Sequence, residues 1–361
     1  MNHKKHICII VDCLCGGGAE KVAATLSFLL ENNDYKVSII AVRNEITYNY
    51  RGILYNLGEN ESSIKWVRHI KKVLLFRKYY KLINADFYID FRMRDRFIME
   101  SLLHFLVFEN RKMIFSIQHY NIAYHIPKGK IFKRLYNKAK TIVAVSLDIE
   151  KELKRYHSFS NIKYIPNFVN KDLLTTSKVP PKDVPNNAIL AIGRLNNPVK
   201  QFDKLILSYK NTSSFIKGIP LFILGDGPDR LKLETLIESN NLQAHVKLLG
   251  FVSNPYDYIK QCKFLVLCSK FEGMPLVILE ALTLEKPVIS FNCKSGPSEL
   301  IVHKENGLLI NNQDFHELEK SIDLLQQDKA LYNKMINNAQ KSVDKFDAYH
   351  MIKHWESCFN I

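Results

Sequence analysis

The sequence predicts an α/β protein built from two doubly wound, parallel-sheet domains. Continuous apolar runs alternate with segments of helical periodicity up to about residue 170, a proline-rich stretch then interrupts this pattern, and the alternation restarts at residue 188. Uninterrupted apolar strands are typical of parallel sheets that helices cover on both faces. A chain of 361 residues is long enough for two such domains, each with its own core.

The first domain is predicted over residues 1–174. Its expected strands are the apolar runs at 6–12, 35–42, 85–91, 112–119, 139–146 and 161–170. Helices are expected between them. The first is AEKVAATLSFLLENN, which follows three glycines and carries apolar residues at helical spacing.

Residues 175–187, TTSKVPPKDVPNN, contain three prolines and no apolar periodicity, so they predict an interdomain linker. The second domain is predicted over 188–346. Its expected strands are 188–195, 219–227, 245–252, 263–269, 286–292 and 307–310, followed by a helical stretch from 315 to 345. The terminal segment 347–361 is expected to be a helix that packs back on the first domain. A ligand is expected where the carboxyl ends of both sets of strands face a central cleft.

The composition indicates a soluble globular protein, with 47% hydrophobic and 24% charged residues. No apolar run approaches the roughly 20 residues of a membrane-spanning helix, and the N-terminus lacks the pattern of a signal peptide. Seven cysteines without a C-x-x-C pair argue against a zinc site and indicate reduced thiols in a cytoplasmic protein. Cys13 and Cys15 lie near His3 and His6, but reduced thiols are the simpler interpretation there too.

The positive charge is concentrated in the first half of the chain. Residues 1–175 contain 29 Lys and Arg against 16 Asp and Glu, whereas residues 176–361 contain 22 against 20. A basic surface attracts nucleic acid, anionic lipid or phosphorylated substrates, and the total charge does not distinguish them.

Three motifs lie where predicted strands end. In the first, Gly16, Gly17 and Gly18 separate the first strand from the first helix, which is the geometry that presents backbone N–H groups to an anion. It is neither a P-loop nor a G-x-G-x-x-G motif. A tight turn without a ligand explains the glycines equally well.

The second motif is GRLNNPVK, in which Gly193, Arg194 and Lys200 follow the first strand of the second domain. Two cations at a strand's carboxyl end can neutralise a diphosphate. Solvated surface cations are the alternative.

The third motif is EGMPLVILE, in which seven residues separate Glu272 from Glu280. Pro275 suits the first turn of a helix, so the N–H groups of Met274, Leu276 and Val277 are expected to point into the cleft. Glu280 interrupts an apolar run, and a carboxylate in that setting usually has a specific partner. Both carboxylates can then reach one extended ligand. Two solvated glutamates on an amphipathic helix are the alternative.

Taken together, GGGAE, GRL with Lys200, LGDGP (224–228) and the E-x7-E element closely resemble glycosyltransferase family 4, the group 1 enzymes of GT-B fold. IPNFVN (165–170) and SGPSELIVHKENGLLI (295–310) match the family as well. The resemblance covers essentially the whole chain. It implies two Rossmann-like domains and a retaining transfer from a sugar nucleotide held mainly by the second domain.

The resemblance also implies roles for individual residues. Arg194 and Lys200 would hold the diphosphate and stabilise the leaving phosphate, Glu272 would contact sugar hydroxyls, and Glu280 would take the ribose. Further donor contacts would come from Gly17, Gly18, Gly193, Gly225, Phe251, Val252, Gly273, Met274, Pro275, Leu276 and Val277. His119, in SIQHYN, aligns with the family's histidine near the donor sugar and is the candidate catalytic histidine; a polar residue that ends a strand is the alternative.

No D-x-D motif that would hold a diphosphate-bound metal stands out, so we expect a metal-independent enzyme without a cofactor. We expect transfer of a hexose or N-acetylhexosamine from a UDP-sugar to a lipid-linked or other glycan acceptor, in the synthesis of a surface polysaccharide, lipopolysaccharide or capsule. A GDP-mannose-dependent mannosyltransferase is the main alternative, and a GT-B nucleotide-sugar epimerase or phosphorylase is another.

Two basic segments, 64–82 and 128–140, are expected to meet an anionic membrane or a lipid-linked acceptor, which would place the protein on the cytoplasmic face of the cell membrane. Along the first segment, Ile64, Val67, Ile70, Val73 and Leu74 are expected on one side of a helix. The cations concerned are Lys65, Arg68, Lys71, Lys72, Arg77, Lys130, Lys133 and Arg134. Solvated helix faces are the alternative. A nucleic-acid binder would leave the E-x7-E element unexplained, so no nucleic acid is expected, and a non-catalytic partner subunit would leave the donor residues unexplained.

Overall fold

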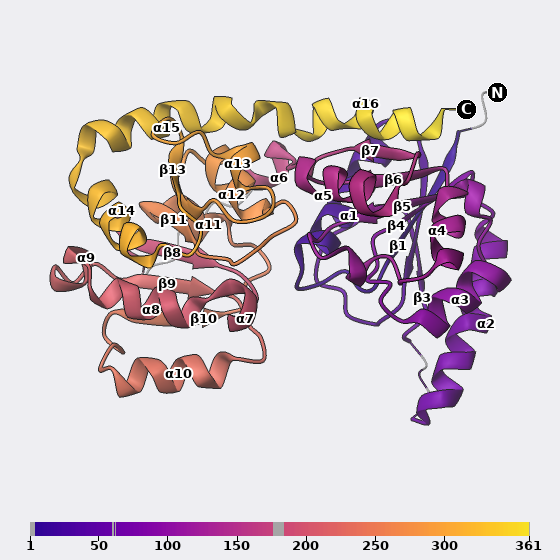
Figure 1. The fold of residues 1–361 in the computed structure, drawn as a ribbon, viewed down its shortest axis with the longest axis horizontal. Helices are drawn as coiled ribbons and strands as arrows, with labels where there is room; N and C mark the ends of the chain where they lie inside the picture. The colour runs from indigo at the N-terminus through magenta and orange to yellow at the C-terminus, as the bar shows by residue number, and fades with distance from the viewer. Residues whose placement is uncertain (1–3, 60, 62, 176–183, 361) are drawn as a thin grey trace. The chain divides into compact units, whose positions relative to one another are not determined.

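The computed structural model describes residues 4–59, 61, 63–175 and 184–360. It divides the chain into two compact units (Figure 1). The first comprises residues 1–167 and 348–361, and the second comprises residues 168–347. Each unit is a doubly wound α/β fold of the predicted class.

A seven-stranded, all-parallel sheet forms the centre of the first unit, with strand order β3-β2-β1-β4-β5-β6-β7. Its strands are β1 (His6–Val11), β2 (Lys36–Ala41), β3 (Ile53–Asn56), β4 (Phe87–Asp90), β5 (Met113–Ile117), β6 (Thr141–Ala144) and β7 (Ile162–Tyr164). β1 is buried along its whole length, as its apolar sequence predicts for a central strand. The strand order reverses between β1 and β4, which is where doubly wound sheets place their ligands.

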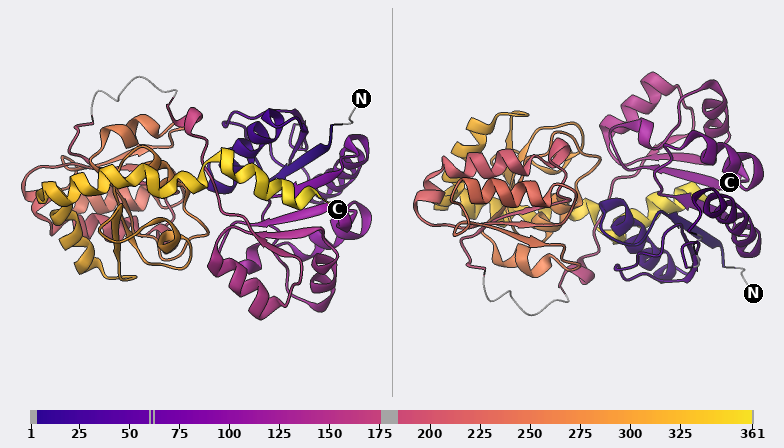
Figure 2. Two further views of the ribbon diagram at one scale, coloured as in Figure 1. Left: turned by 90° about the horizontal axis from the view of Figure 1, so that it is seen from above. Right: turned by 90° about the horizontal axis from the view of Figure 1, so that it is seen from below.

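Helices lie on both sides of this sheet (Figure 2). They are α1 (Gly18–Asn32), α2 (Lys65–Ile83), α3 (Phe97–Leu106), α4 (Lys130–Asn137) and α5 (Leu147–Glu152), with short helical turns η1 (Asn110–Lys112), η2 (Ile122–Tyr124) and η3 (Leu153–His157). The last helix of the chain, α16 (Ala348–Phe359), also belongs to this unit. The ring of Phe359, in α16, packs against the rings of Tyr35 and Phe87, whose centroids lie 5.5 and 5.8 Å from its own.

The second unit has a six-stranded parallel sheet of order β10-β9-β8-β11-β12-β13. Its strands are β8 (Ile189–Ile192), β9 (Leu221–Leu224), β10 (Val246–Gly250), β11 (Phe264–Leu267), β12 (Val288–Phe291) and β13 (Gly307–Ile310). Here the order reverses between β8 and β11, so the two sheets share one topology through all six strands, and the first sheet adds a seventh strand at its edge.

The helices of the second unit cover both faces of its sheet. They are α6 (Lys171–Thr175), α7 (Asn197–Lys200), α8 (Phe202–Lys210), α9 (Ser213–Ile216), α10 (Arg230–Ser239), α11 (Tyr256–Gln261), α12 (Leu276–Thr283), α13 (Pro297–Leu300), α14 (Phe315–Gln327) and α15 (Lys329–Val343), with the turn η4 (Asp344–Phe346). The predicted helical stretch 315–345 is therefore two helices. Asp328 separates them, and its side chain accepts a hydrogen bond from the Leu331 N–H at the start of α15.

Every strand predicted from the sequence is present, but one strand was missed. β3 is an edge strand whose first residue, Ile53, is 54% exposed. It is only four residues long and half-buried, so its sequence lacks the continuous apolar run that identifies the central strands.

The chain passes from the first unit to the second at residue 167, and residues 168–174, expected in the first domain, lie in the second unit. The N–H of Val169 donates to the carbonyl of Phe346 at 3.1 Å, and Lys171 pairs with Asp344. These contacts hold the start of the second unit beside its end. Residues 176–183 of the expected linker lie outside the described residues.

Candidate functional site

In the second unit, the ends of β8 and β9 approach each other closely at the predicted donor residues. A Cβ atom on Gly225, which has a φ of +136°, would lie 1.9 Å from the carbonyl oxygen of Gly193. Only glycine fits at this position. A Cβ on Gly193 would lie 3.3 Å from the Cε of Lys200, so this glycine leaves room for the aliphatic part of the lysine.

Lys200 and Glu272 meet at this edge of the sheet although 72 residues separate them. The Lys200 Nζ donates to Glu272 Oε1 at 2.6 Å, and the two side chains remain 20% and 12% exposed. Lys200 is the last residue of α7. Its backbone carbonyl accepts a hydrogen bond at 3.1 Å from the thiol of Cys268, which follows β11. The loop before α12 holds Glu272, whose N–H donates to the Lys294 carbonyl at 2.7 Å. The structure therefore brings the predicted diphosphate and sugar contacts together as one ion pair.

The predicted helix after Glu272 is α12, and Pro275 is the residue immediately before its first turn. Gly273, Met274, Pro275 and Leu276 are buried and Val277 is half-buried. The hydroxyl of Ser295 donates to the Gly273 carbonyl at 2.7 Å and so fixes this loop. The Ile278 N–H donates to the Pro275 carbonyl at 3.1 Å, so the N–H groups of Leu276 and Val277 are the ones at the start of α12 that can bind an anion.

Glu280 lies in the second turn of α12 and is only 4% exposed. It lies on the same helix as Leu276 and Val277, on the C-terminal side of the loop that holds Glu272. Both carboxylates of the E-x7-E element thus belong to one local structure, with Glu272 accessible and Glu280 buried.

The remaining donor candidates of the second unit surround these groups at the carboxyl edge of the sheet. Arg194 is exposed directly after β8. Phe251 and Val252 follow β10, and Phe251 is 44% exposed. The Gly225 N–H donates to the carbonyl of Gly250 at 2.8 Å, which ties the loop after β9 to the residue before Phe251.

In the first unit, the three glycines follow β1 at the point where the sheet order reverses. Gly16 has a φ of +68°, Gly17 is the N-cap of α1, and Gly18 is its first residue. The Gly17 N–H donates to the Cys15 carbonyl at 2.8 Å, and the Glu20 carboxylate lies beside Gly17, where a Cβ would be 2.0 Å from Glu20 Oε2. That the start of α1 binds an anion stays a prediction.

His119 follows β5 at the same edge of the first sheet. Its Nδ1 accepts a hydrogen bond from the Asn121 N–H at 2.9 Å, and its ring packs edge-on against Tyr124. A neutral imidazole that accepts at Nδ1 carries its proton at Nε2. In this arrangement His119 is a hydrogen-bond donor through Nε2 rather than a base through Nδ1.

A buried charge cluster that the sequence analysis did not identify lies after β4. The Arg92 guanidinium donates to both carboxylate oxygens of Asp90, at 3.0 and 2.7 Å, and to Glu100 Oε1 at 3.2 Å. Arg94, completely buried, donates to the carbonyls of Asp90 and Ser116. The signal in the sequence is DFRMRDRF (90–97), three arginines directly after a buried strand.

The cluster shifts the pKa values of its members in opposite directions. Burial would raise the pKa of Asp90, but the two guanidiniums more than offset it, so this pKa is lowered. Burial prevails at Glu100, whose pKa is raised although Arg92 opposes it. His104, enclosed by aromatic rings, has its pKa lowered to about 4, mainly by burial. Asp12 accepts from the Met93 N–H at 2.8 Å, which joins this cluster to the end of β1.

The basic helix α2 is arranged differently from the prediction. Its buried face consists of Val73, Phe76, Tyr80 and Ile83, whereas Ile70 and Leu74, expected on the same apolar side as Val73, are 54% and 60% exposed. The expectation failed because the buried residues follow an i, i+3, i+7, i+10 spacing that begins at Val73.

The predicted cations of α2 do not all face solvent. Lys72 pairs with Glu61 and donates to the Val42 carbonyl at 2.8 Å, and Arg68 also pairs with Glu61. Lys71 and Arg77 are exposed, and the side chain of Lys65 lies outside the described residues.

An exposed apolar and basic surface lies instead on α3 and α4, which we call the α3–α4 surface. Its apolar members are Phe97, Ile98, Leu102, Phe105 and Ile131, and its cations are Lys128, Lys130, Lys133 and Arg134, all exposed. The Phe97 ring contacts Phe132 with centroids 5.1 Å apart, which joins the two helices. Ile98 is 75% exposed and Phe105 66%.

The cysteine pair near the glycine loop does not lie beside His6, one of the two histidines near it in the sequence. His6 lies at the opposite end of β1, and its Nε2 is 2.9 Å from the Ser38 hydroxyl. His3 lies outside the described residues. Cys13 and Cys15 instead lie beside Glu45, and these three form the one potential metal-ligand group within residues 4–59, 61, 63–175 and 184–360. Burial raises the pKa of both thiols.

No helix in the described parts of the chain is long and apolar enough to cross a membrane.

Comparison with known families matches residues 175–342 to the model described as Glycosyl transferases group 1. The amylovoran biosynthesis glycosyltransferase AmsD of Erwinia amylovora is 24% identical, over 98% of this chain and 99% of that protein. An N-acetylgalactosamine-N,N'-diacetylbacillosaminyl-diphospho-undecaprenol 4-alpha-N-acetylgalactosaminyltransferase of Campylobacter jejuni is 27% identical, over 94% and 95%.

Among solved structures, S. aureus TarM in complex with fondaparinux, alpha-GlcNAc-glycerol and UDP has a TM-score of 0.80. The alignment covers 99% of this chain and all of that chain, at 16% sequence identity. This likeness establishes the shared fold.

Proposed function

We propose that this chain, which matches the group 1 glycosyltransferase model over residues 175–342 and has the GT-B fold, transfers a hexose or N-acetylhexosamine from a UDP-sugar to a lipid-linked glycan acceptor. The observation that carries the proposal is the Lys200–Glu272 pair beside the N-terminus of α12. In a sugar nucleotide the sugar is bonded directly to the diphosphate. A cation for phosphate and a carboxylate for sugar hydroxyls must therefore be neighbours, as these two groups are.

The proposed step follows from this arrangement. The bond between the sugar C1 and the phosphate oxygen breaks, the acceptor oxygen bonds to C1 on the same face, and the leaving phosphate oxygen takes the acceptor's proton. Configuration is therefore retained. Lys200 and Arg194 stabilise the charge that develops on the phosphate, so the diphosphate needs no divalent ion.

Glu272 orients the sugar through its hydroxyls, and Glu280 accepts hydrogen bonds from the ribose. Gly17 and Gly18 leave space for the diphosphate, and His119 donates from Nε2 to the donor sugar. The base lies beside Phe251 and Val252. One relative is a glycosyltransferase of amylovoran biosynthesis and another acts on a diphospho-undecaprenol-linked sugar, which supports a glycan acceptor in surface-polysaccharide synthesis. The UDP in the TarM complex supports a UDP-sugar.

The test is calorimetric titration of the reduced, chelator-treated protein with UDP and, separately, with GDP. UDP binding without GDP binding is expected, and Lys200→Met should weaken it whereas Lys210→Met, an exposed lysine on α8, should not. Preference for GDP would change the donor to GDP-mannose. Binding of neither nucleotide would overturn the proposal.

Activity assays test the chemical step. Turnover in EDTA should equal turnover without it, and the anomeric proton coupling of the product should report the donor's configuration. His119→Gln, which keeps an N–H donor, should retain more activity than His119→Ala. A His119→Ala enzyme with near-full turnover would remove the histidine from the mechanism.

We also propose that the first unit binds an anionic membrane surface from the cytoplasmic side, and that the α3–α4 surface makes this contact together with Lys71 and Arg77 of α2. Large apolar side chains beside lysines and arginines are the combination that enters the headgroup region of anionic bilayers. Each cation near such a surface adds about 1 kcal/mol.

Flotation with vesicles of phosphatidylglycerol and of phosphatidylcholine tests this contact. Replacing Lys130, Lys133 and Arg134 with Gln should weaken binding to the anionic vesicles by up to about a hundredfold. Ile98→Ser with Phe105→Ser should weaken it further, whereas Ile216→Ser, an equally exposed apolar residue of the second unit, should not. Flotation that is independent of anionic lipid would overturn the proposal.

A further inference from the structure

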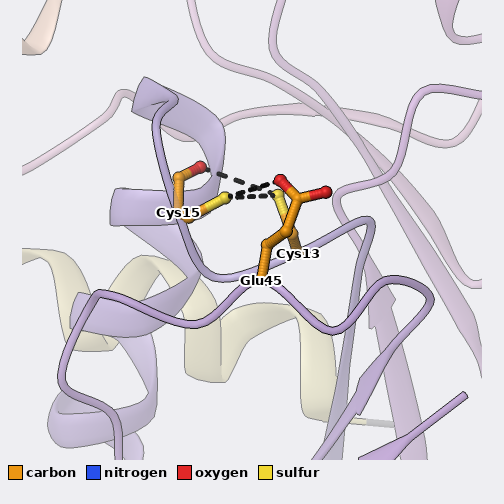
Figure 3. A group of neighbouring side chains, drawn as sticks. All are labelled: Cys13, Cys15 and Glu45. Carbon is orange, nitrogen blue, oxygen red and sulfur yellow. Dashed lines mark hydrogen bonds between the residues drawn. The ribbon is translucent and has the colours of Figure 1, made fainter. Parts of the chain in front are cut away.

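The three side chains beside the glycine loop point to one another (Figure 3). The Sγ atoms of Cys13 and Cys15 are 3.2 Å apart, and Cys15 Sγ lies 3.3 Å from Glu45 Oε2. Cys13 is buried, Cys15 half-buried and Glu45 exposed, so the group has a protein side and a solvent side.

Backbone pairing explains why these side chains share one face. Leu14 forms a parallel bridge with Ile46: its N–H donates to the Glu45 carbonyl at 3.0 Å, and its carbonyl accepts from the Thr47 N–H at 2.9 Å. Side chains alternate along extended backbone. Leu14 is therefore buried on one face, while Cys13, Cys15 and Glu45 lie on the other.

We propose that Cys13, Cys15 and Glu45 form a binding site for a zinc-like, thiophilic divalent cation. Two thiolates and a carboxylate are ligands that zinc accepts, and water can complete a tetrahedron from the exposed side. Cations such as Mg²⁺, which prefer oxygen ligands, are disfavoured by the two sulfurs.

The geometry requires only small movements. A tetrahedral ion with bonds of about 2.3 Å separates two sulfurs by about 3.8 Å, and the half-buried Cys15 side chain can supply the difference. All three ligand atoms already lie within 4.8 Å of one another. As each metal–sulfur bond forms, the thiol releases its proton to solvent.

The charges around the site also balance. A divalent ion with two thiolates and one carboxylate leaves one negative charge. Arg43 offsets this charge, because its guanidinium lies 3.1 Å from Cys13 Sγ and 3.3 Å from Glu45 Oε1. The Gly17 N–H donates to the Cys15 carbonyl. A bound ion would therefore tie the segment that precedes the glycine loop to the segment around Glu45.

All three ligands belong to the first unit, and none of them is among the proposed donor-binding residues. The site therefore does not depend on the proposed function. Its test is binding rather than turnover.

The experiment is titration of the full chain, chelator-treated and kept reduced with a phosphine, with Co²⁺ followed by Zn²⁺. One equivalent of Co²⁺ should produce a sulfur-to-cobalt charge-transfer band, and Zn²⁺ should remove it. Cys15→Ser should abolish the band and Glu45→Gln should lower the Co²⁺ affinity about tenfold or more. Cys358→Ala, another thiol of the first unit, should leave both unchanged.

Cys15 is half-buried, so its serine variant should fold, and the unchanged tryptophan fluorescence of that variant verifies this. Absence of the band with excess Co²⁺ would overturn the proposal. A band of equal intensity in Cys15→Ser would overturn it as well, because the ion would then be bound elsewhere.

Discussion

The two sheets reach their reversal points with the same strand order, yet they use charge there in opposite ways. After β4, the side chains of Asp90 and Glu100 are balanced by those of Arg92 and Arg94, and all four are at most 5% exposed. After β8, Arg194 is exposed, and the Lys200–Glu272 pair keeps contact with solvent. Charges that hold the architecture are buried and compensated, whereas charges available to a ligand are partly exposed and can exchange partners.

The strongest test of this difference is to remove Arg92, the central cation of the buried cluster. Arg92→Met leaves Asp90 and Glu100 as buried carboxylates without their main partner. The first unit should lose about 3–5 kcal/mol of unfolding free energy. Urea unfolding followed by tryptophan fluorescence measures this, because both tryptophans, Trp66 and Trp355, belong to the first unit.

The matched change in the second unit should have the reverse profile. Lys200→Met removes a cation from the developing phosphate charge and should lower kcat by about 10²–10³-fold, while urea unfolding of the second unit, followed by circular dichroism because both tryptophans lie in the first unit, stays in place. Steady-state kinetics measures kcat for Lys200→Met, and Lys210→Met is the control variant, whose kcat should not change. If Lys200→Met instead destabilised the second unit and left kcat intact, its pair with Glu272 would be structural like that of Arg92.

The buried cluster also predicts a pH dependence. The folded chain holds the pKa of His104 at about 4, against 6.5 for the ordinary side chain, so the unfolded chain binds the proton more readily between these values. The contribution of neutral His104 is thus fully present above pH 6.5 and is lost as the pH falls toward 4, by up to about 3 kcal/mol. His104→Phe, which keeps an aromatic ring, should flatten the stability profile of the first unit in that window. Parallel profiles for the two proteins would contradict this.

The smallest effect should distinguish the two carboxylates of the cluster. The pKa of Asp90 is lowered and that of Glu100 is raised, so the charge is favoured at Asp90 and disfavoured at Glu100. Glu100→Gln should therefore cost about 1 kcal/mol or less, and Asp90→Asn clearly more. Urea unfolding of the two variants measures both losses of unfolding free energy. A larger loss for Glu100→Gln than for Asp90→Asn would show that Glu100 is the main charged partner of Arg92.

Much of the second unit was predictable because its signals are local. The strands, the turn glycines and the helix after Glu272 each follow from residues within one short segment. Gly225 and Pro275 act through backbone conformation that their own chemistry determines. The edge strand β3 was not predictable in this way, because partial burial leaves no continuous apolar run. The buried face of α2 was wrongly predicted because two of its apolar residues, Ile70 and Leu74, are exposed.

The sequence by itself determined the alternation of strands and helices, the number of sheets and the motifs at the strand ends, because these depend on apolar periodicity and on turn residues. Only the tertiary structure decided which charges meet. Lys200 reaches Glu272 across 72 residues, and Cys15 reaches Glu45 across 30. In the sequence, Arg92 and Lys200 are both cations that follow a strand. Their burial depends on packing from the whole unit: Arg92 is buried among carboxylates, whereas Lys200 stays partly exposed and available to a ligand.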